Sequence, residues 1–370
     1  MDRILAAASA AALAAGLALP AAAQDAEREV SRHVEALRAM QPDPARSDEY
    51  NREMDEAWKA FDAHPARSLP LLRSTLIAET RRAEPSPMVL LDVGYYLYTH
   101  GAALDKDAAL AALLAVDPRA PVVRHNQQQL FYFTLSVAND RVPRVLDFID
   151  RAFLENDVQV VVPPNGLTLD AVLSSVFLYG VYGEGAEAHL WPILKDPKWE
   201  RRALEVLVWI GTPASNDAVR DAIYRHRDYE TFARATAFLM QDGGPGGRDI
   251  MLSIDAQKLE PQAAQFYGVS RPRVEASNYA WYKGLFERSP GPDRIADAEL
   301  RKQLAAMPSH SRSAEPLAPK AIFASALPRE DLVKLLLAAR HAMFERVSDE
   351  ALGDVKTTNM LLNGLRYRPS

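Results

Sequence analysis

The sequence predicts an all-α protein, a right-handed α-solenoid of antiparallel helix pairs followed by irregular C-terminal helices. Three observations lead to this fold class. Apolar residues recur three and four positions apart along most of the chain, which is the period of an amphipathic helix. The helical segments come in pairs joined by tight turns that contain glycine or proline. Each segment is too short to be stable alone in water, so the pairs must bury their apolar faces against neighbouring pairs.

The best-formed pair spans Trp199 to Ile223. We expect Asp196 to cap its first helix and Pro197 to occupy the first turn, where a missing N–H costs nothing. Gly211 is expected just after the last helical residue, and Asn216 should cap the second helix. The apolar residues of the first helix are spaced four, three and four apart, at Trp199, Ala203, Val206 and Ile210.

Helix pairs of this kind recur between residues 86 and 257. Their first helices begin near positions 87, 126, 169, 199 and 229, at spacings of about 39, 43, 30 and 30 residues. The turn Gly183-x-x-Ala186 is repeated as Gly211-x-x-Ala214. With these features the segment resembles HEAT-like repeats of degenerate sequence. The resemblance implies a protein-binding scaffold, and it carries over no catalytic residue.

Residues 24–85 are predicted to form an N-terminal helical cap, because the terminal units of a solenoid are atypical. Serine and aspartate residues give the expected helix starts here and in the first repeat. The predicted N-caps include Ser68, Ser86 and Asp105. The three helices of the cap are expected over Ala26–Met40, Ser47–Phe61 and Ser68–Glu79.

Residues 258–370 are predicted to form a less regular C-terminal helical region. A polar, proline-containing linker is expected over Ser309–Lys320, followed by a strong amphipathic helix over Arg329–Val347. Ser348 is expected to cap a short segment, and Thr357–Leu365 is expected to be the last helix.

The helical pattern is broken between residues 154 and 167. The β-branched run Val158–Val162 is bounded by turn residues, which predicts a short strand or an extended loop. Insertions into a repeat array often lie on its binding face. The alternative is a connector that packs across the repeats and only joins two helices.

Residues 1–23 have the pattern of a secretory signal peptide. Arg3 precedes the apolar run Ile4–Leu19, and Ala21-Ala22-Ala23 supplies small residues for cleavage before Gln24. We therefore expect the protein to be periplasmic or secreted in a Gram-negative bacterium. No membrane span is expected after signal cleavage, because no later apolar stretch is long enough.

Composition excludes several classes of function. The net charge of −6 comes from interspersed charges of both signs, which argues against nucleic acid as a partner. The chain has no cysteine, which excludes disulfides, thiolate metal sites and a cysteine nucleophile. No nucleotide-binding, nucleophile-elbow or H-E-x-x-H motif is present, and no two of the eight histidines have helical ligand spacing. The sequence therefore predicts no cofactor and no metal site, and leaves any catalytic residue unknown.

Aromatic residues recur near the predicted C-terminal ends of first helices. If these ends share one edge of the solenoid, the rings would form a ladder for a ligand, since tyrosine and tryptophan combine apolar area with a polar group. The alternative is ordinary packing in the core and at its edge. The candidate ligand-binding residues are Tyr95, Tyr98, Tyr179, Tyr182 and Trp209.

These features predict an exported protein- or peptide-binding scaffold whose partner is another envelope protein or a peptide. The alternative is an envelope enzyme or polymer-binding protein whose site is assembled from distant residues in the solenoid groove. A deep pocket with buried ionisable groups would favour the alternative, and a smooth tyrosine-lined groove would favour the scaffold. A purely structural role in an envelope assembly is a third hypothesis.

Overall fold

The computed structural model describes residues 21–40, 47–163, 166–225, 229–241, 246–307 and 317–369. This part of the chain is helical apart from one small sheet, which confirms the all-α class. Within it, no helix is both long and apolar enough for a membrane span. The predicted signal peptide, except for its last three residues, and most of the predicted linker at 309–320 lie outside the described residues.

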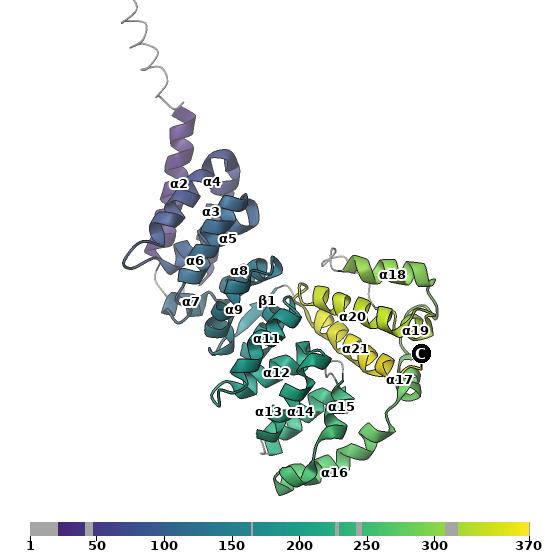
Figure 1. The fold of residues 1–370 in the computed structure, drawn as a ribbon. Coiled ribbons are helices and arrows are strands. Elements are labelled where there is room, and N and C mark those ends of the chain that lie inside the picture. The colour runs from purple at the N-terminus through teal and green to yellow at the C-terminus, as the bar shows by residue number, and fades with distance from the viewer. Residues whose placement is uncertain are drawn as a thin grey trace, which may run out of the picture. The chain divides into compact units, whose positions relative to one another are not determined.

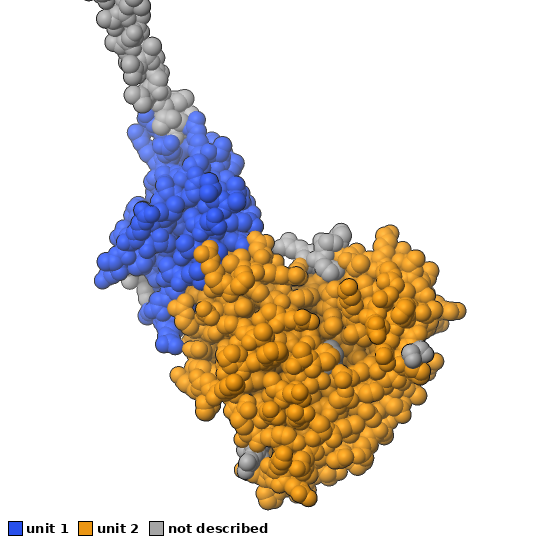
Figure 2. All heavy atoms as spheres, in the orientation of Figure 1, with its two compact units in different colours: residues 1–133 blue, residues 134–370 orange. Residues whose placement is uncertain are grey.

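The chain forms two compact units, residues 1–133 and residues 134–370 (Figure 2). The predicted boundaries at residues 85 and 257 remain predictions. In the first unit, α5 is the central helix, with ten of its fourteen residues buried and with α4 and α6 packed against it. The helices of this unit are α2 (Ala21–Ala39), α3 (Ser47–Ala63), α4 (Pro65–Glu79), α5 (Pro87–His100), α6 (Ala103–Ala115), α7 (Pro121–His125) and α8 (Gln127–Asn139), the last of which continues past residue 133.

Ser86 caps α5 as predicted, but the other two predicted caps in this unit are wrong. Pro65 starts α4 because its fixed φ suits a first turn, and Ser68 lies buried one turn later, donating to the His64 carbonyl at 3.1 Å. Asp105 lies inside the first turn of α6, where its carboxylate accepts from the Ala102 N–H at 2.9 Å. A carboxylate at this position reaches back to the free N–H before the helix.

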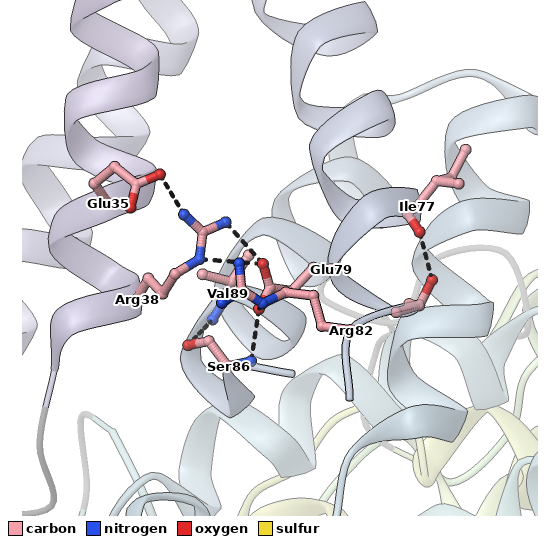
Figure 3. Close-up of polar contacts among 8 residues, drawn as sticks. Glu35, Arg38, Ile77, Glu79, Arg82, Ser86 and Val89 are labelled. Carbon is pink, nitrogen blue, oxygen red and sulfur yellow. Dashed lines mark hydrogen bonds and ion pairs between the residues drawn. The ribbon is translucent and has the colours of Figure 1, made fainter. Parts of the chain in front are cut away.

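An ion network around the buried Glu79 joins α2, α4 and the start of α5 (Figure 3). Glu79 is 1% exposed, and its Oε2 accepts from Arg38 Nε at 3.2 Å and from the Arg38 Nη2 at 2.7 Å. Its Oε1 accepts from the Ser86 N–H at 2.7 Å and lies 3.4 Å from Arg82 Nε. Arg38 also pairs with Glu35 on its own helix. Both Glu79 oxygens thus have partners, which is the condition for burying a carboxylate without a large penalty.

In the second unit, successive helices make a chain of contacts. α10 packs on α12, α12 on α14, and α14 on α16, while α11 packs on α12 and α13 on α15 (Figure 1). A 3-10 turn leads into α9, which ends in a π-helical turn over Asp150–Leu154. The bounds are α9 (Leu146–Ile149), α10 (Ala171–Gly180), α11 (Glu184–Ile193), α12 (Glu200–Ile210), α13 (Asn216–Arg225), α14 (Tyr229–Gln241), α15 (Gly247–Ser253) and α16 (Pro261–Ala276).

The pair that begins at Trp199 starts later than predicted. Asp196 forms a turn, in which its side chain accepts from the Lys198 N–H at 2.9 Å, so α12 begins only at Glu200. Gly211 ends α12 as predicted, because a Cβ there would lie 2.5 Å from the Leu207 carbonyl oxygen. Thr212 supplies the side-chain cap of the following 3-10 turn, and Asn216, predicted to cap the second helix, is instead the first residue of α13.

The β-branched run forms a strand whose partner the sequence did not reveal. β1 (Val160–Val162) pairs antiparallel with β2 (Leu167–Leu169), with Val160 opposite Leu169. Arg202 of α12 donates to the carbonyls of Leu154 and Asn156 at 2.9 and 3.0 Å, which fastens the start of the insertion to the helix.

The C-terminal helices pack against the ends of α10 and α12. Arg340 donates to the carbonyls of Ile210 and Gly211 at 2.8 and 3.1 Å, and Asn359 donates to that of Trp209 at 3.2 Å. These bonds satisfy carbonyls that a helix end leaves without partners. The two segments predicted after Ser348 are one helix, which Ser348 caps. The helices are α17 (Tyr279–Phe286), α18 (Asp297–Ala306), α19 (Pro319–Ala324), α20 (Arg329–Met343) and α21 (Asp349–Arg366).

Candidate functional site

A pocket of about 510 Å³ lies in the first unit, between α3, α5 and the start of α8. Residues three and four apart on a helix share a face, so α3 and α8 each present one continuous stripe to the pocket. The side chains that line it include Tyr50, Met54, Asp55 and Trp58 from α3, Asp92 and Tyr95 from α5, and Gln128, Gln129 and Tyr132 from α8.

Asp92 is the buried ionisable group of this pocket. It is 1% exposed, and its Oδ1 accepts from Trp58 Nε1 at 3.0 Å and from Gln129 Nε2 at 2.7 Å. Its Oδ2 is shielded from solvent and has no hydrogen-bond partner among the described residues, and the same holds for Oε1 of Gln129. Two residues that line the pocket and are bonded to each other thus each keep a buried acceptor without a partner, which contrasts with the fully partnered Glu79.

Burial raises the pKa of Asp92 to about 7, against the opposing effect of its bonds to Trp58 and Gln129. The nearby charge of Asp55 raises the pKa further. Near neutral pH the carboxyl is therefore poised between its two protonation states, and a cation beside it would favour the charged form.

Aromatic rings form the walls. The Trp58 ring meets Tyr95 edge-on, with centroids 5.5 Å apart, and Tyr96 and His100 contact it at 5.3 and 5.5 Å. Packing on these sides fixes the indole while its N–H holds Asp92. The rings of Tyr50 and Tyr132 complete the lining. Aromatic faces with a carboxylate attract a cation, and Asp55 adds a second negative charge at the rim.

The structure separates the predicted aromatic residues. Of the five, Tyr95 lines the large pocket, and Tyr98 is buried nearby with Lys106 Nζ 4.8 Å from its ring centroid. In the second unit Tyr182 lines a smaller cavity of about 290 Å³ and donates to the Val142 carbonyl at 3.0 Å. Tyr179 and Trp209 are buried in the helix packing of that unit, at 0% and 7% exposure.

A second polar cluster lies beside Tyr179. Asp150 accepts from the Tyr179 hydroxyl and lies 2.8 Å from Nε2 of His189, and Asp147 brings a ligand atom within 4.8 Å of the Asp150 and His189 atoms. The bond to Asp150 raises the pKa of His189. The oxygens of Asp150 are thus already used inside the protein. Oxygen and nitrogen donors of this kind suit a divalent cation, but the internal bonds explain the arrangement equally well.

Sequence reasoning missed the central group of the pocket. Asp92 stands inside the apolar run PMVLLDVGYYL, and a lone acid in such a run is a signal that it needs a partner or a function. Trp58 lies within the predicted helix Ser47–Phe61, and nothing in the local sequence connects it to Asp92, 34 positions away.

No protein family, curated protein or solved structure matches the chain.

Proposed function

We propose that this chain is a binding protein whose pocket in the first unit accepts a primary ammonium group presented by a peptide or protein partner. The observation that carries the proposal is the pair of buried acceptors, Asp92 Oδ2 and Gln129 Oε1, without partners in a pocket walled by aromatic rings. Such acceptors are costly to bury, and the N–H groups of a lysine side chain or a terminal amine would satisfy both.

The shape of the pocket agrees with this ligand. A lysine side chain has an apolar stem that the rings of Trp58, Tyr95 and Tyr132 would cover, and a compact charge at its end. Because both acceptors are shielded from water, the ligand nitrogen reaches them by displacing the ends of neighbouring side chains. The cost of this displacement is offset by the charge-assisted bond to the carboxylate.

The architecture proposed for the second unit is a right-handed solenoid of antiparallel, HEAT-like helix pairs. This arrangement is supported by the serial contacts of α10, α12, α14 and α16. The helices α11, α13 and α15 lie between them in the chain. A stack of helix pairs offers an extended surface for a protein partner. Export to the periplasm is supported by the signal-peptide pattern of residues 1–23, so the partner we propose is an envelope protein or peptide.

The second candidate function is an envelope enzyme in which Asp92 acts as a general base. The observation in its favour is the pKa of about 7, which suits proton transfer at neutral pH. Both described hydrogen-bond donors to Asp92, Trp58 and Gln129, are neutral groups that hold the carboxylate in place. Neutral donors of this kind fit a ligand-binding carboxylate better than a catalytic pair of ionisable groups.

Calorimetric titration of the full chain with N-acetyl-lysine amide and with N-acetyl-norleucine amide tests the proposal. We expect the lysine compound to bind and the neutral norleucine compound to bind at least tenfold more weakly, since a charged hydrogen bond contributes about 1.5–3 kcal/mol. Asp92→Asn should remove this preference, whereas Asp107→Asn, an exposed acid on α6, should leave it unchanged. Equal affinity for the two compounds would contradict the proposal, and turnover of an amine-bearing substrate would favour the enzyme.

A further inference from the structure

A second pocket, in the second unit, differs from the first in both chemistry and charge. It has a volume of about 440 Å³ and lies between α14, α15, the end of α16, α17 and α21. This volume is in the range of small-molecule sites. Its apolar lining includes Leu239, Met251, Val274, Trp281, Leu285 and Met360.

Part of this apolar lining faces solvent. Trp281 is 47% exposed and Leu285 is 40% exposed, and they lie four residues apart on one face of α17. Large apolar side chains that gather at a cavity mark a binding site more often than single exposed ones do. The packing of the helices does not explain why these two remain uncovered.

All charged side chains that line the pocket are basic. Arg248, Arg273 and Lys356 contribute to it, and none of the described residues in its lining is acidic. The neighbouring carboxylates have basic partners outside the lining, since Asp249 pairs with Arg366 at 2.8 Å and Glu275 pairs with Arg271 at 2.7 Å. The charged part of the lining is therefore positive, beside an apolar interior.

The basic residues have different roles. Arg248 donates to the Ser277 carbonyl at 2.6 Å and lies over the Tyr367 ring at 4.7 Å, so it is held in place while keeping its charge. Arg273 is exposed and has no hydrogen bond or ion pair with another described residue. Its guanidinium is free to form a bidentate bond with a carboxylate.

We infer that this pocket binds a single-chain amphiphile that carries a carboxylate, in the manner of a fatty acid. The tail would cover Trp281, Leu285 and Val274, and the carboxylate would meet Arg273 at the rim. Charge complementarity selects this occupant over a neutral or cationic lipid, and the apolar lining selects it over a small anion. The inference is independent of the ammonium pocket of the first unit.

Titration of the full chain with octanoate, 1-octanol and acetate tests the inference, with each ligand kept monomeric in solution. Octanoate has both the tail and the charge, octanol has only the tail, and acetate has only the charge. We expect octanoate to bind at least tenfold more tightly than either of the others, because a charged bond and an apolar contact each contribute on this order.

Two variants place the site. Arg273→Gln should weaken octanoate binding about tenfold, whereas Arg271→Gln, two residues away on a different side of α16, should leave it unchanged. Leu285→Asp adds a negative charge at the exposed rim and should abolish binding without unfolding the protein, which circular dichroism would verify. Equal affinity for octanol would overturn the role of the charge, equal affinity for acetate would overturn the role of the tail, and absence of octanoate binding would overturn the inference as a whole.

Discussion

Asp92 connects the stability of the first unit to pH. Burial raises its pKa from 3.8 to about 7 in the folded protein, so the folded state holds a proton that the unfolded chain loses near pH 4. The stabilisation from this proton is complete below the unfolded pKa and is lost as the pH rises through about 7. The carboxyl group that we propose to bind the ligand thus destabilises the empty protein at neutral and alkaline pH.

Replacement of this acid should therefore stabilise the protein at high pH. Asn keeps an acceptor for Trp58 and Gln129 but carries no charge. The free energy of unfolding of Asp92→Asn, relative to that of the wild type, should therefore increase by about 2–3 kcal/mol as the pH rises from 5 to 8. Denaturant unfolding at the two pH values measures the difference. A variant that is less stable than the wild type by the same amount at both pH values would show that Asp92 is not protonated in the fold.

Glu79 shows the opposite use of a buried acid. Arg38, Arg82 and the Ser86 N–H surround it, so removal of Arg38 leaves a buried carboxylate with fewer partners. We expect Arg38→Ala to lower the free energy of unfolding by about 3 kcal/mol. Arg28→Ala on the same helix removes an exposed pair with Asp25 and should have no measurable effect. A similar loss in both variants would indicate that helix propensity, and not the network, determines the result.

The packing of α20 against α10 depends on a glycine. A Cβ at Gly180 would lie 2.2 Å from Cγ of Phe344, which is closer than atoms can approach. We expect Gly180→Ala to cost about 1–3 kcal/mol, because the phenyl ring must leave its position between the helices. The matched variant Gly185→Ala meets no atom within 4 Å at the start of α11 and should be neutral or stabilising. Thermal unfolding of the two variants gives the comparison, and equal stability would show that α20 can shift without cost.

Helix periodicity predicted which segments are helical better than where they begin. Ser86, Gly211 and Ser348 mark helix ends in the structure as predicted. Asp105 and Asp196 did not act as caps, because an aspartate can equally serve the first turn of a helix or the turn before it. The hairpin of β1 and β2 was half predicted, since only the first strand has a β-branched run.

Long-range contacts hold the second unit together, and the sequence does not display them. Arg340 is 4% exposed and bonds carbonyls about 130 positions earlier in the chain, at the end of α12. Its burial lowers its pKa to about 10, which leaves it charged at neutral pH. The sequence predicts an open aromatic edge at the ends of α10 and α12. In the structure α20 and α21, which come much later in the chain, pack against these ends.

We expect Arg340→Ala to lower the free energy of unfolding of the second unit by about 3 kcal/mol, because three buried acceptors lose their hydrogen-bond donor. Lys334→Ala, an exposed position on the same helix, should change stability little. Hydrogen exchange would show the loss at the backbone of α12 as well as in α20. Faster exchange in α20 alone would contradict the role of Arg340 as a link between the two.

The pocket of the first unit could be predicted only in part, because contacts between residues distant in sequence form it too. Tyr95 was identified from its place near a helix end, but Trp58, Asp92 and Gln129 come from three helices whose order of packing no local pattern encodes. A pocket with a buried acid was the feature expected of an enzyme or polymer-binding protein. The neutral donors around Asp92 are what direct the interpretation toward recognition of a cation.

The central claim is that a ligand ammonium group binds beside the Asp92 carboxylate, and proton release on binding tests it most directly. Because the pKa of Asp92 is raised to about 7, part of the population carries a proton at pH 7, and a bound cation lowers this pKa, so each ligand should release a measurable fraction of a proton. Calorimetric titration with N-acetyl-lysine amide in buffers of different ionisation enthalpy measures this number. The account predicts a release of this size in the wild type and none in Asp92→Asn. Binding of equal affinity in both proteins, without proton release in either, would contradict it.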